Sequence, residues 1–508
     1  MAFCKRKASM RKSDALFSCS EIPFMKLPIE VTCMIFEYAA PYSTVRSQEP
    51  AKLLLPEVVV SHVCRTWRKI SLGFPRLWTA FSHDASLTPR VPLDRFDAYL
   101  ERSTSHHLDL WFGFKKAGKF TEHFKLLENA LPHIARWRCF TFSSDTHSDI
   151  LAVLRFLGRL KSTAAPQLQH ISLRPAFGDL RRLGIMAPHV DTNTASTLFV
   201  DGAPKLRSLM LDGTSGFIYL PLLSNITTLR IEVPDGHAYS IPLSWPTLQH
   251  VLSVPSLTNL SLVGEMLDIT DSHFDPQCPI KMGSLKHLRF GSNDALIFIL
   301  SVLHAPLLET LFLDNIWLPF DMVTIPVATD IGHGSHAFPL LKSVSFSQVH
   351  SSSVYPHETL YFARMLESAT EICICNKSYV DSMFETLLND RDLNQKYWTN
   401  VKHVTLCPRV AKELEDVIRF AADRPENGLV VHVSEETVKY WKKYKTEYTS
   451  VDVLKKWCSI DVIHSMNPPW SGPWPPGDCT PIDRLSDGGD PFDMNLYFEP
   501  FSDGNATT

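Results

Sequence analysis

Two histidines and a carboxylate lie close together in residues 330–336, which read Asp-Ile-Gly-His-Gly-Ser-His. Imidazole nitrogens and carboxylate oxygens are ordinary zinc ligands, so Asp330, His333 and His336 are the residues whose types best suit metal chemistry. A zinc site also needs further ligands at a regular spacing, and no such pattern accompanies this segment. We therefore expect a polar loop here, with no metal and no cofactor.

The sequence motifs of common enzymes are absent from the chain. It contains no Gly-x-x-x-x-Gly-Lys-Ser/Thr, Gly-x-Gly-x-x-Gly, His-Glu-x-x-His or Gly-x-Ser-x-Gly, which would bind phosphates or zinc or carry a serine nucleophile. The 11 cysteines are scattered, and the close pair Cys373 and Cys375 suits one face of a strand better than a zinc site. We expect a chain without catalytic residues, and an enzyme with an unrecognised site remains an alternative.

The apolar residues that follow position 27 indicate a helix that binds a partner. Pro28 suits the first turn of a helix because its missing N–H costs nothing there, and Glu30 is favoured by the helix dipole. The helix to about residue 40 has two apolar stripes, one of Ile29, Cys33, Phe36 and Ala40 and one of Val31, Met34, Ile35 and Tyr38. A small module cannot bury both stripes, so one of them is expected to contact a partner.

A second amphipathic helix is predicted from residue 60. Its apolar positions are Val60, Val63, Cys64, Trp67 and Ile70. This spacing predicts a buried core stripe, with Arg65, Arg68 and Lys69 on the solvent side. A plain helical hairpin that caps the rest of the chain would show the same pattern and remains an alternative.

The order of these motifs resembles the F-box of fungal, basidiomycete-type proteins that carry a C-terminal leucine-rich-repeat-like region. The resemblance rests on Leu27-Pro28-x-Glu30, Ile35-Phe36, Val63-Cys64-x-x-Trp67 and Pro75-x-Leu77-Trp78. It implies a module that docks onto the Skp-type adaptor of an SCF-type cullin ubiquitin ligase. It also implies docking residues, which contact the adaptor or shape the surface that does: Leu27, Pro28, Glu30, Ile35, Phe36, Val63, Cys64 and Trp67.

A degenerate repeat of the form Pro-x-Leu-x-x-Leu-x-Leu runs through the middle of the chain. Five copies keep the proline, at 166–173, 204–211, 255–262, 306–313 and 339–346, and four lack it, at 226–231, 285–290, 369–374 and 401–406. The last four positions predict a strand, and apolar stretches at 150–160, 248–254, 295–303 and 359–366 predict helices before several strands. Two earlier units, 96–111 and 124–142, are similar.

Helix followed by strand is the unit of a leucine-rich repeat. The predicted fold class is therefore α/β: an irregular leucine-rich-repeat-like solenoid with a parallel sheet on its concave side and helices outside, preceded by a small all-α F-box. The copies recur every 20 to 38 residues, against about 20–29 in a regular repeat, so loops at 177–202, 264–281 and 318–337 should protrude. The concave strand face offers the candidate substrate-binding residues Ser261, Phe312, Asp314 and Ser345.

Changes in composition predict the organisation of the chain. The expected parts are a disordered basic N-terminus (1–21), an F-box domain (22–82), a solenoid (93–434), a helical cap (435–462) and a Pro/Gly/Asp-rich tail (463–508). The tail carries Trp470 and Trp474, and it is either disordered or draped over the solenoid through these residues. Partial docking is favoured, because disordered tails contain few tryptophans.

Length and charge limit the classes of partner. At 508 residues, with 44% hydrophobic and 20% charged residues, the chain is globular and too long for one ordinary core. A net charge of −4 gives no basic balance for nucleic acid. No run of about 18 apolar residues predicts a membrane span. The N-terminus lacks a secretory core, and Lys5-Arg6-Lys7 is either a nuclear address or a solvated start. We expect a cytoplasmic or nuclear protein.

These observations favour a substrate-recognition subunit of a ubiquitin ligase complex, acting in the ubiquitin conjugation pathway. The F-box would bind the adaptor, the repeats would bind an unidentified protein substrate, and other subunits would supply the chemistry. The alternative is a leucine-rich-repeat interaction scaffold without a ligase role.

Overall fold

The chain divides into two compact units. Unit 1 consists of residues 1–79 and 98–106, and unit 2 of residues 80–97 and 107–508. The computed structural model describes residues 27–39, 56–86, 90–114, 120–144, 150–175, 198–212, 223–232, 245–264, 280–291, 299–300, 302–317, 338–350, 363–375, 398–406, 412–424, 428–443, 450–463 and 474.

Unit 1 contains three short helices and a 3-10 turn. They are α1 (Ile29–Ala39), α2 (Pro56–Val63), α3 (Arg65–Leu72) and η5 (Pro75–Trp78). The prediction of one continuous second helix is wrong, because the backbone of Cys64 is extended and interrupts it. Cys64 instead caps α3, where its Sγ accepts a hydrogen bond from the backbone N–H of Trp67 at 3.4 Å.

Aromatic side chains form the core of unit 1. Phe36 is buried, and its ring meets the half-buried ring of Trp67 edge to face at 5.1 Å between centroids. The buried Trp78 donates from Nε1 to the carbonyl oxygen of Ser71 at 2.8 Å and packs edge to face against Tyr99 at 5.2 Å. The contact between Phe36 and Trp67 fixes the face of α1 that turns inward.

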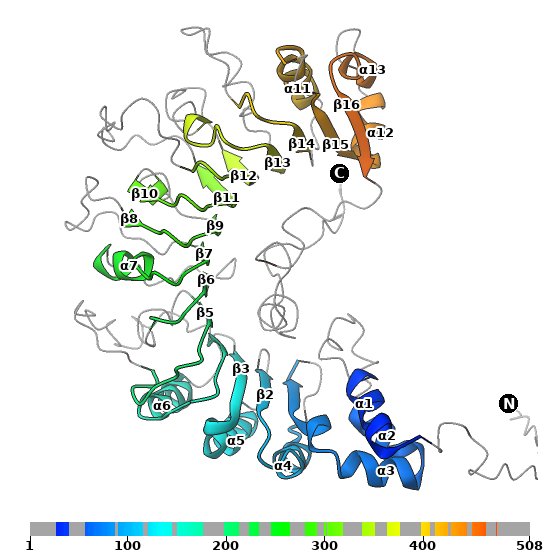
Figure 1. The fold of residues 1–508 in the computed structure, drawn as a ribbon, viewed down its shortest axis with the longest axis vertical. Helices are drawn as coiled ribbons and strands as arrows, with labels where there is room; N and C mark the ends of the chain where they lie inside the picture. The colour runs from blue at the N-terminus through cyan, green and yellow to red at the C-terminus, as the bar shows by residue number, and fades with distance from the viewer. Residues whose placement is uncertain are drawn as a thin grey trace, which may run out of the picture. The chain divides into compact units, whose positions relative to one another are not determined.

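Unit 2 is an α/β structure built on a large parallel sheet of 14 strands (Figure 1). The strands, in sheet order, are β1 (Ala80–Asp84), β2 (Leu108–Gly113), β3 (Trp137–Ser143), β4 (His170–Arg174), β5 (Ser208–Asp212), β6 (Thr228–Glu232), β7 (Asn259–Val263), β9 (His287–Gly291), β11 (Thr310–Trp317), β12 (Ser343–His350), β13 (Glu371–Cys375), β14 (His403–Leu406), β15 (Val430–Ser434) and β16 (Ser459–Ile463). A separate pair consists of β8 (Ile280–Lys281) and β10 (Leu303–His304). Sheet order therefore follows chain order.

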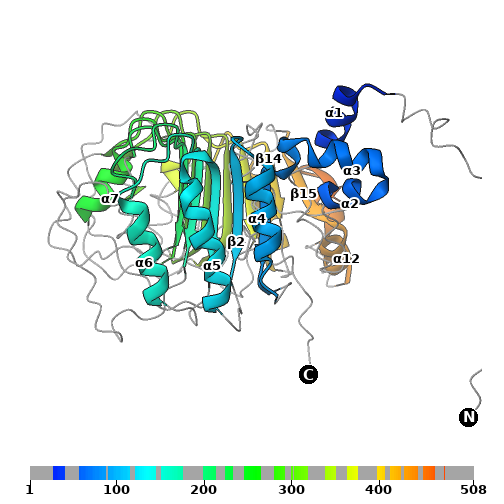
Figure 2. The same ribbon diagram turned by 90° about the horizontal axis from the view of Figure 1, so that it is seen from below.

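The helical segments of unit 2 lie between strands in the sequence. They are α5 (Phe120–Ala130), η6 (Leu131–Arg136), α6 (Ile150–Lys161), α7 (Trp245–Leu252), α11 (Lys412–Ala422), α12 (Glu435–Lys443) and α13 (Val451–Leu454), and α4 (Leu93–Arg102) has residues in both units. The helices α5, α6 and α7 lie on one face of the sheet (Figure 2). The other face is available for polar side chains. None of the described helices is long and apolar enough to cross a lipid bilayer.

The strands pair in a register that aligns the apolar positions of the repeat. Leu311 of β11 stands beside Leu288 of β9 and Val344 of β12, and Leu313 is aligned with Phe290 in the same way. All five side chains are buried. Because side chains alternate along a strand, these residues share the face packed against the helices. The predicted strands of the repeat template are thus confirmed.

Other sequence predictions are confirmed in part or corrected. The helices predicted at 150–160 and 248–254 correspond to α6 and α7. The sheet extends beyond the predicted solenoid, residues 93–434. Its first strand, β1, begins at Ala80, and its last strand, β16, ends at Ile463. The segment 435–462 is therefore not a purely helical cap, since β16 pairs with β15 along its whole length.

Several predictions concern parts of the chain outside the described residues. These are the basic N-terminus, almost all of the three long loops, the segment 330–336 and the tail apart from Ile463 and Trp474. Of the helices predicted at 295–303 and 359–366, only short pieces are described.

The register can be tested with two leucines that lie close together in the sequence. Leu311→Ala should lower the free energy of unfolding by about 2–5 kcal/mol, because it leaves a cavity in the shared core. Leu307→Ala should change it by less than about 0.5 kcal/mol, because that side chain is 40% exposed. Urea unfolding followed by circular dichroism measures both, and equal effects of the two substitutions would contradict the register.

Candidate functional site

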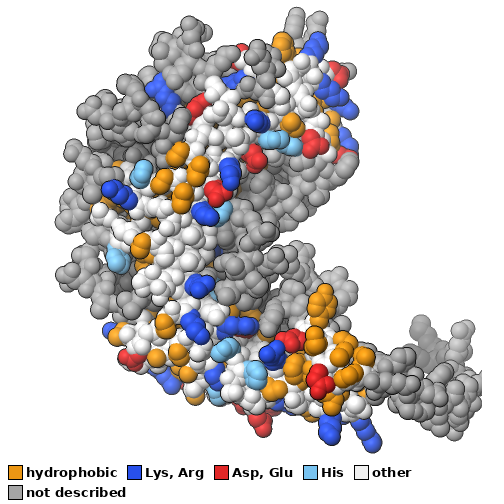
Figure 3. Space-filling model, in the orientation of Figure 1, with side chains coloured by type: hydrophobic (Ala, Val, Ile, Leu, Met, Phe, Trp, Pro, Cys, Tyr) orange, Lys and Arg blue, Asp and Glu red, His pale blue; other side chains and the backbone are white. Residues whose placement is uncertain are grey.

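An apolar surface without a described partner lies on unit 1. Four side chains of α1 form a stripe at helical spacing, namely Val31, Met34, Ile35 and Tyr38, and all four are exposed. Met34 is 68% and Tyr38 92% exposed, values that only a side chain directed into solvent reaches. Figure 3 shows hydrophobic side chains gathered over this part of the molecule. We call these four residues the α1 stripe.

Unit 1 exposes further apolar side chains besides the α1 stripe. Leu27 and Ile29 precede it in the sequence, and Val59 and Val63 of α2 are also exposed. The opposite side of α1 is occupied, since Thr32 and Phe36 are buried. A helix whose apolar side chains are exposed on one side and packed on the other is typical of a protein-binding face.

The residues predicted to dock an adaptor fall into two groups. Leu27, Pro28, Glu30, Ile35 and Val63 are exposed and can contact a partner directly. Phe36 is buried, and Cys64 and Trp67 are half-buried, so these three support the surface from behind. The prediction that Val63 lies in a core stripe is wrong, because its side chain is 55% exposed at the end of α2.

Met34 and Tyr38 were absent from the predicted docking residues although they are the most exposed members of the α1 stripe. Their spacing with Val31 and Ile35 indicates the stripe in the sequence, but the predicted docking residues come from the motif that carries the resemblance. A sequence motif consists of the residues that recur in a family. Which side chains of α1 are exposed depends instead on which side of the helix packs against the core of unit 1.

The second candidate region is the face of the sheet opposite the leucines, which we call the polar face. Its side chains stand in rows across the strands, because the register is parallel and continuous. One row runs through Arg230, Ser261, Arg289, Phe312 and Ser345, on β6, β7, β9, β11 and β12. Neighbouring strands lie about 4.8 Å apart, so adjacent members of the row are within reach of one another.

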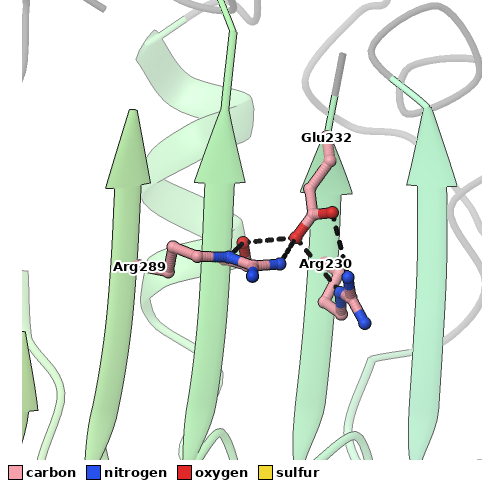
Figure 4. A network of polar contacts seen from close by, with 4 residues as sticks. Arg230, Glu232 and Arg289 are labelled. Carbon is pink, nitrogen blue, oxygen red and sulfur yellow. Dashed lines mark hydrogen bonds and ion pairs between the residues drawn. The ribbon is translucent and has the colours of Figure 1, made fainter. Parts of the chain in front are cut away.

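Three members of this row, Arg230, Ser261 and Arg289, form a buried ionic network with Glu232 of β6 on the polar face (Figure 4). The guanidinium of Arg230 donates two hydrogen bonds to the carboxylate of Glu232, each of 3.1 Å. Arg289 donates to the same carboxylate and, from Nε, to Ser261 Oγ at 2.8 Å. Ser261 in turn donates to Glu232 Oε1 at 2.5 Å. The network joins β6, β7 and β9, and it carries a net positive charge.

The charge of Glu232 is set by its neighbours. Burial by itself raises the pKa of this carboxyl, but the charges of Arg230 and Arg289 outweigh burial and hold the pKa well below its usual range. Hydrogen bonds from Arg230 and Ser261 act in the same direction. Glu232 therefore remains ionised throughout the physiological range, and the network is an ion pair extended by a second cation.

Polar pairs at the start of the strands add to this surface. Neighbouring strands are joined by His170–Ser208, Thr228–Asn259 and His287–Thr310, each with a side-chain hydrogen bond of 2.9 Å. Burial, followed by the charges of Arg230 and Arg174, lowers the pKa of His170 to about 3. His170 is therefore neutral at pH 7. It adds a hydrogen-bonding group to the polar face without adding a charge.

All four predicted substrate-binding residues lie on the polar face. Ser261 belongs to the ionic network, Phe312 and Ser345 stand in its row, and Asp314 lies two residues further along β11. A Cβ at Gly291 would approach both the Cβ and the backbone oxygen of Asp314 to 3.1 Å, a tight contact, so a larger residue here would press on Asp314. The four residues were expected at the surface, but each is largely buried.

Arg230, Glu232 and Arg289 were not predicted from the sequence. One sequence signal for them exists. In each repeat, one residue stands between the two apolar residues that point into the core, and this residue is arginine in both Leu229-Arg230-Ile231 and Leu288-Arg289-Phe290. Two arginines at equivalent positions of two repeats indicate a shared site only when the strand register shows that they lie close together.

Metal binding is not supported by the described residues, and neither is a reactive thiol at Cys373. No group of three or more His, Cys, Asp or Glu among them could hold a metal ion. Burial raises the pKa of the Cys373 thiol far above its ordinary value, so this cysteine is not a nucleophile. The two regions described here are suited to binding.

Comparison with known proteins gives no assignment. No protein-family model matches the chain, and no curated protein matches it.

The ionic network should behave as a unit in stability measurements. Glu232→Ala should destabilise unit 2 by about 3–5 kcal/mol, because it leaves two buried guanidinium groups without their carboxylate. The triple change Arg230→Met, Glu232→Leu and Arg289→Met should recover most of that loss, since apolar side chains of similar volume need no partner. Urea unfolding of the three proteins makes the comparison, and a triple variant no more stable than Glu232→Ala would contradict it.

The lowered pKa of Glu232 predicts a dependence of stability on pH. The unfolded carboxyl titrates near 4.5, and the folded one titrates lower, so below that pH the unfolded state binds more protons. The stability that the charged Glu232 contributes is complete above about pH 5 and is lost as the pH falls toward the folded pKa. The difference in unfolding free energy between the parent and Glu232→Gln should therefore shrink between about pH 6 and pH 3. A difference that stays constant over this interval would show that Glu232 is not held ionised.

Proposed function

We propose that this chain is a substrate-recognition subunit of an SCF-type cullin ubiquitin ligase. In this proposal unit 1 is an F-box that binds the Skp-type adaptor, and unit 2 is an irregular leucine-rich-repeat-type solenoid that binds a protein substrate. The chain supplies no catalytic residue and acts in the cytoplasm or the nucleus. The observation that carries the proposal is the exposed α1 stripe next to the Leu27-Pro28 motif.

The physical support comes from the cost of leaving the α1 stripe in water. Apolar area contributes about 25 cal/mol per Å² when it is removed from solvent. A row of four large side chains on one helix is therefore a strong anchor for a partner with a matching groove. Phe36 and Trp67 hold the helix from the other side, so the surface is formed before the partner arrives.

Unit 2 supports the second half of the proposal. Its polar face places side chains from several strands side by side in rows, so one binding site can draw residues from several repeats. A receptor of this kind accelerates ubiquitin transfer by proximity, since it raises the effective concentration of substrate lysines near a charged enzyme. No chemistry is required of the receptor itself.

Adaptor binding tests the proposal. The double change Met34→Ser and Tyr38→Ser should weaken co-purification of a Skp-type adaptor at least about tenfold, because it removes central apolar contacts of the interface. Circular dichroism should stay unchanged, since both side chains point into solvent.

The matched control is Leu151→Ser, which changes a side chain that is 61% exposed in unit 2. This variant should bind the adaptor as the parent does. If the parent binds the adaptor and the α1 double variant binds equally well, the α1 stripe is not the docking surface. If the parent fails to bind any Skp-type adaptor, the chain is a repeat scaffold without a ligase role.

A further inference from the structure

The indole ring of Trp474 lies over the ionic network of the polar face. The Cζ atom of Arg289 is 5.0 Å from the ring centroid, and the Cζ atom of Arg230 is 5.9 Å from it. Both distances are within the range of about 6 Å over which a cation is attracted to an aromatic face. Trp474 thus contacts two cations that belong to β6 and β9.

The hydrogen bonds of the network leave the flat faces of both guanidinium groups able to contact the ring of Trp474. The hydrogen bonds of a guanidinium lie in its plane, and in both arginines they engage Glu232, with Ser261 as a further partner of Arg289. Stacking uses the flat faces instead, so an aromatic ring and the carboxylate do not compete. The network is a preformed platform, because its hydrogen bonds fix both guanidinium planes.

The burial of the network also points to an occupant. Arg230 and Arg289 are each only 3% exposed, although they project from the face of the sheet opposite the helices. Guanidinium groups at that depth are shielded from water, which strengthens their attraction to an aromatic ring. The partly buried Trp474 contributes to this shielding.

The sequence around Trp474 suits a ligand. Trp474 lies between Pro473 and Pro475 in a segment that also contains Pro468, Pro469 and Pro476. Proline restricts the unbound chain, so binding costs less conformational entropy than it would for a flexible peptide.

We propose that the Arg230–Glu232–Arg289 network is a binding site for a tryptophan carried on a proline-rich segment, and that Trp474 of this chain occupies the site intramolecularly. The ligand class is an aromatic, proline-rich peptide, recognised by two guanidinium faces. A ligand of the same chemistry from another protein has to displace Trp474 before it binds. The proposal does not depend on adaptor binding by unit 1.

The test uses full-length protein and a labelled synthetic peptide with the sequence of residues 467–477. A tethered ligand competes at an effective concentration on the order of millimolar, so the parent should bind the peptide weakly. Trp474→Ala vacates the site and should bind it at least about tenfold more tightly in fluorescence anisotropy. Trp470→Ala, which changes the same residue type four positions earlier, should behave as the parent.

Changes in the peptide identify the contact. A peptide with alanine in place of Trp474 should lose binding to the Trp474→Ala protein, whereas alanine in place of Trp470 should not matter. A tetrafluorinated tryptophan at position 474 keeps the size of the ring but weakens its negative face. It should reduce the affinity several-fold if the guanidinium groups are the partners.

A change in the platform completes the test. In the Trp474→Ala background, Arg289→Lys keeps the charge but removes the flat face, and it should weaken peptide binding several-fold. Arg138→Lys is the matched control, because Arg138 is paired with Asp109 elsewhere in the sheet. Equal peptide affinity for the parent and the Trp474→Ala protein, or no binding to either at millimolar peptide, would overturn the proposal. Full affinity of the fluorinated peptide would overturn the guanidinium contact.

Discussion

Hydrogen bonding between parallel strands in continuous register is the constraint on which the rest of unit 2 depends. It places residues of the same repeat position side by side, so an apolar residue at every second position becomes a buried ladder. The same bonds place the intervening residues in rows on the polar face. Glu232 and Arg289 are 57 residues apart in the sequence, yet they share a hydrogen-bonded network because their strands are separated only by β7.

The strands and several helices of unit 2 could be predicted because their signal is local. The spacing Leu-x-x-Leu-x-Leu contains both the period of a strand and the turn that precedes it, and the structure places Leu260, Leu262, Leu311 and Leu313 in the core as expected. The edges of the sheet were harder to predict. The strand β1 begins two residues after Trp78 and lacks the repeat template, and β16 comes after two helices. Only pairing with a neighbouring strand identifies them.

The candidate sites depend on relations between segments, which a single sequence hides. The direction of Ser261 and Phe312 followed from alternation, but their burial did not, because burial depends on what lies above the sheet. The ionic network required the register of three strands at once. In unit 1 the extended backbone of Cys64 separates two helices. Without this interruption Val63 would lie within a continuous helix, where its spacing predicts that it faces the core.

The ionic network has a consequence for how this surface can change during evolution. A side chain of a row that makes no bond to a neighbouring strand can be substituted without disturbing that strand. Arg230, Glu232 and Arg289 are different, since each is buried and satisfied by the others. Variation among homologues should therefore be independent at such positions and correlated across β6 and β9, where the three charges can be lost or gained only together.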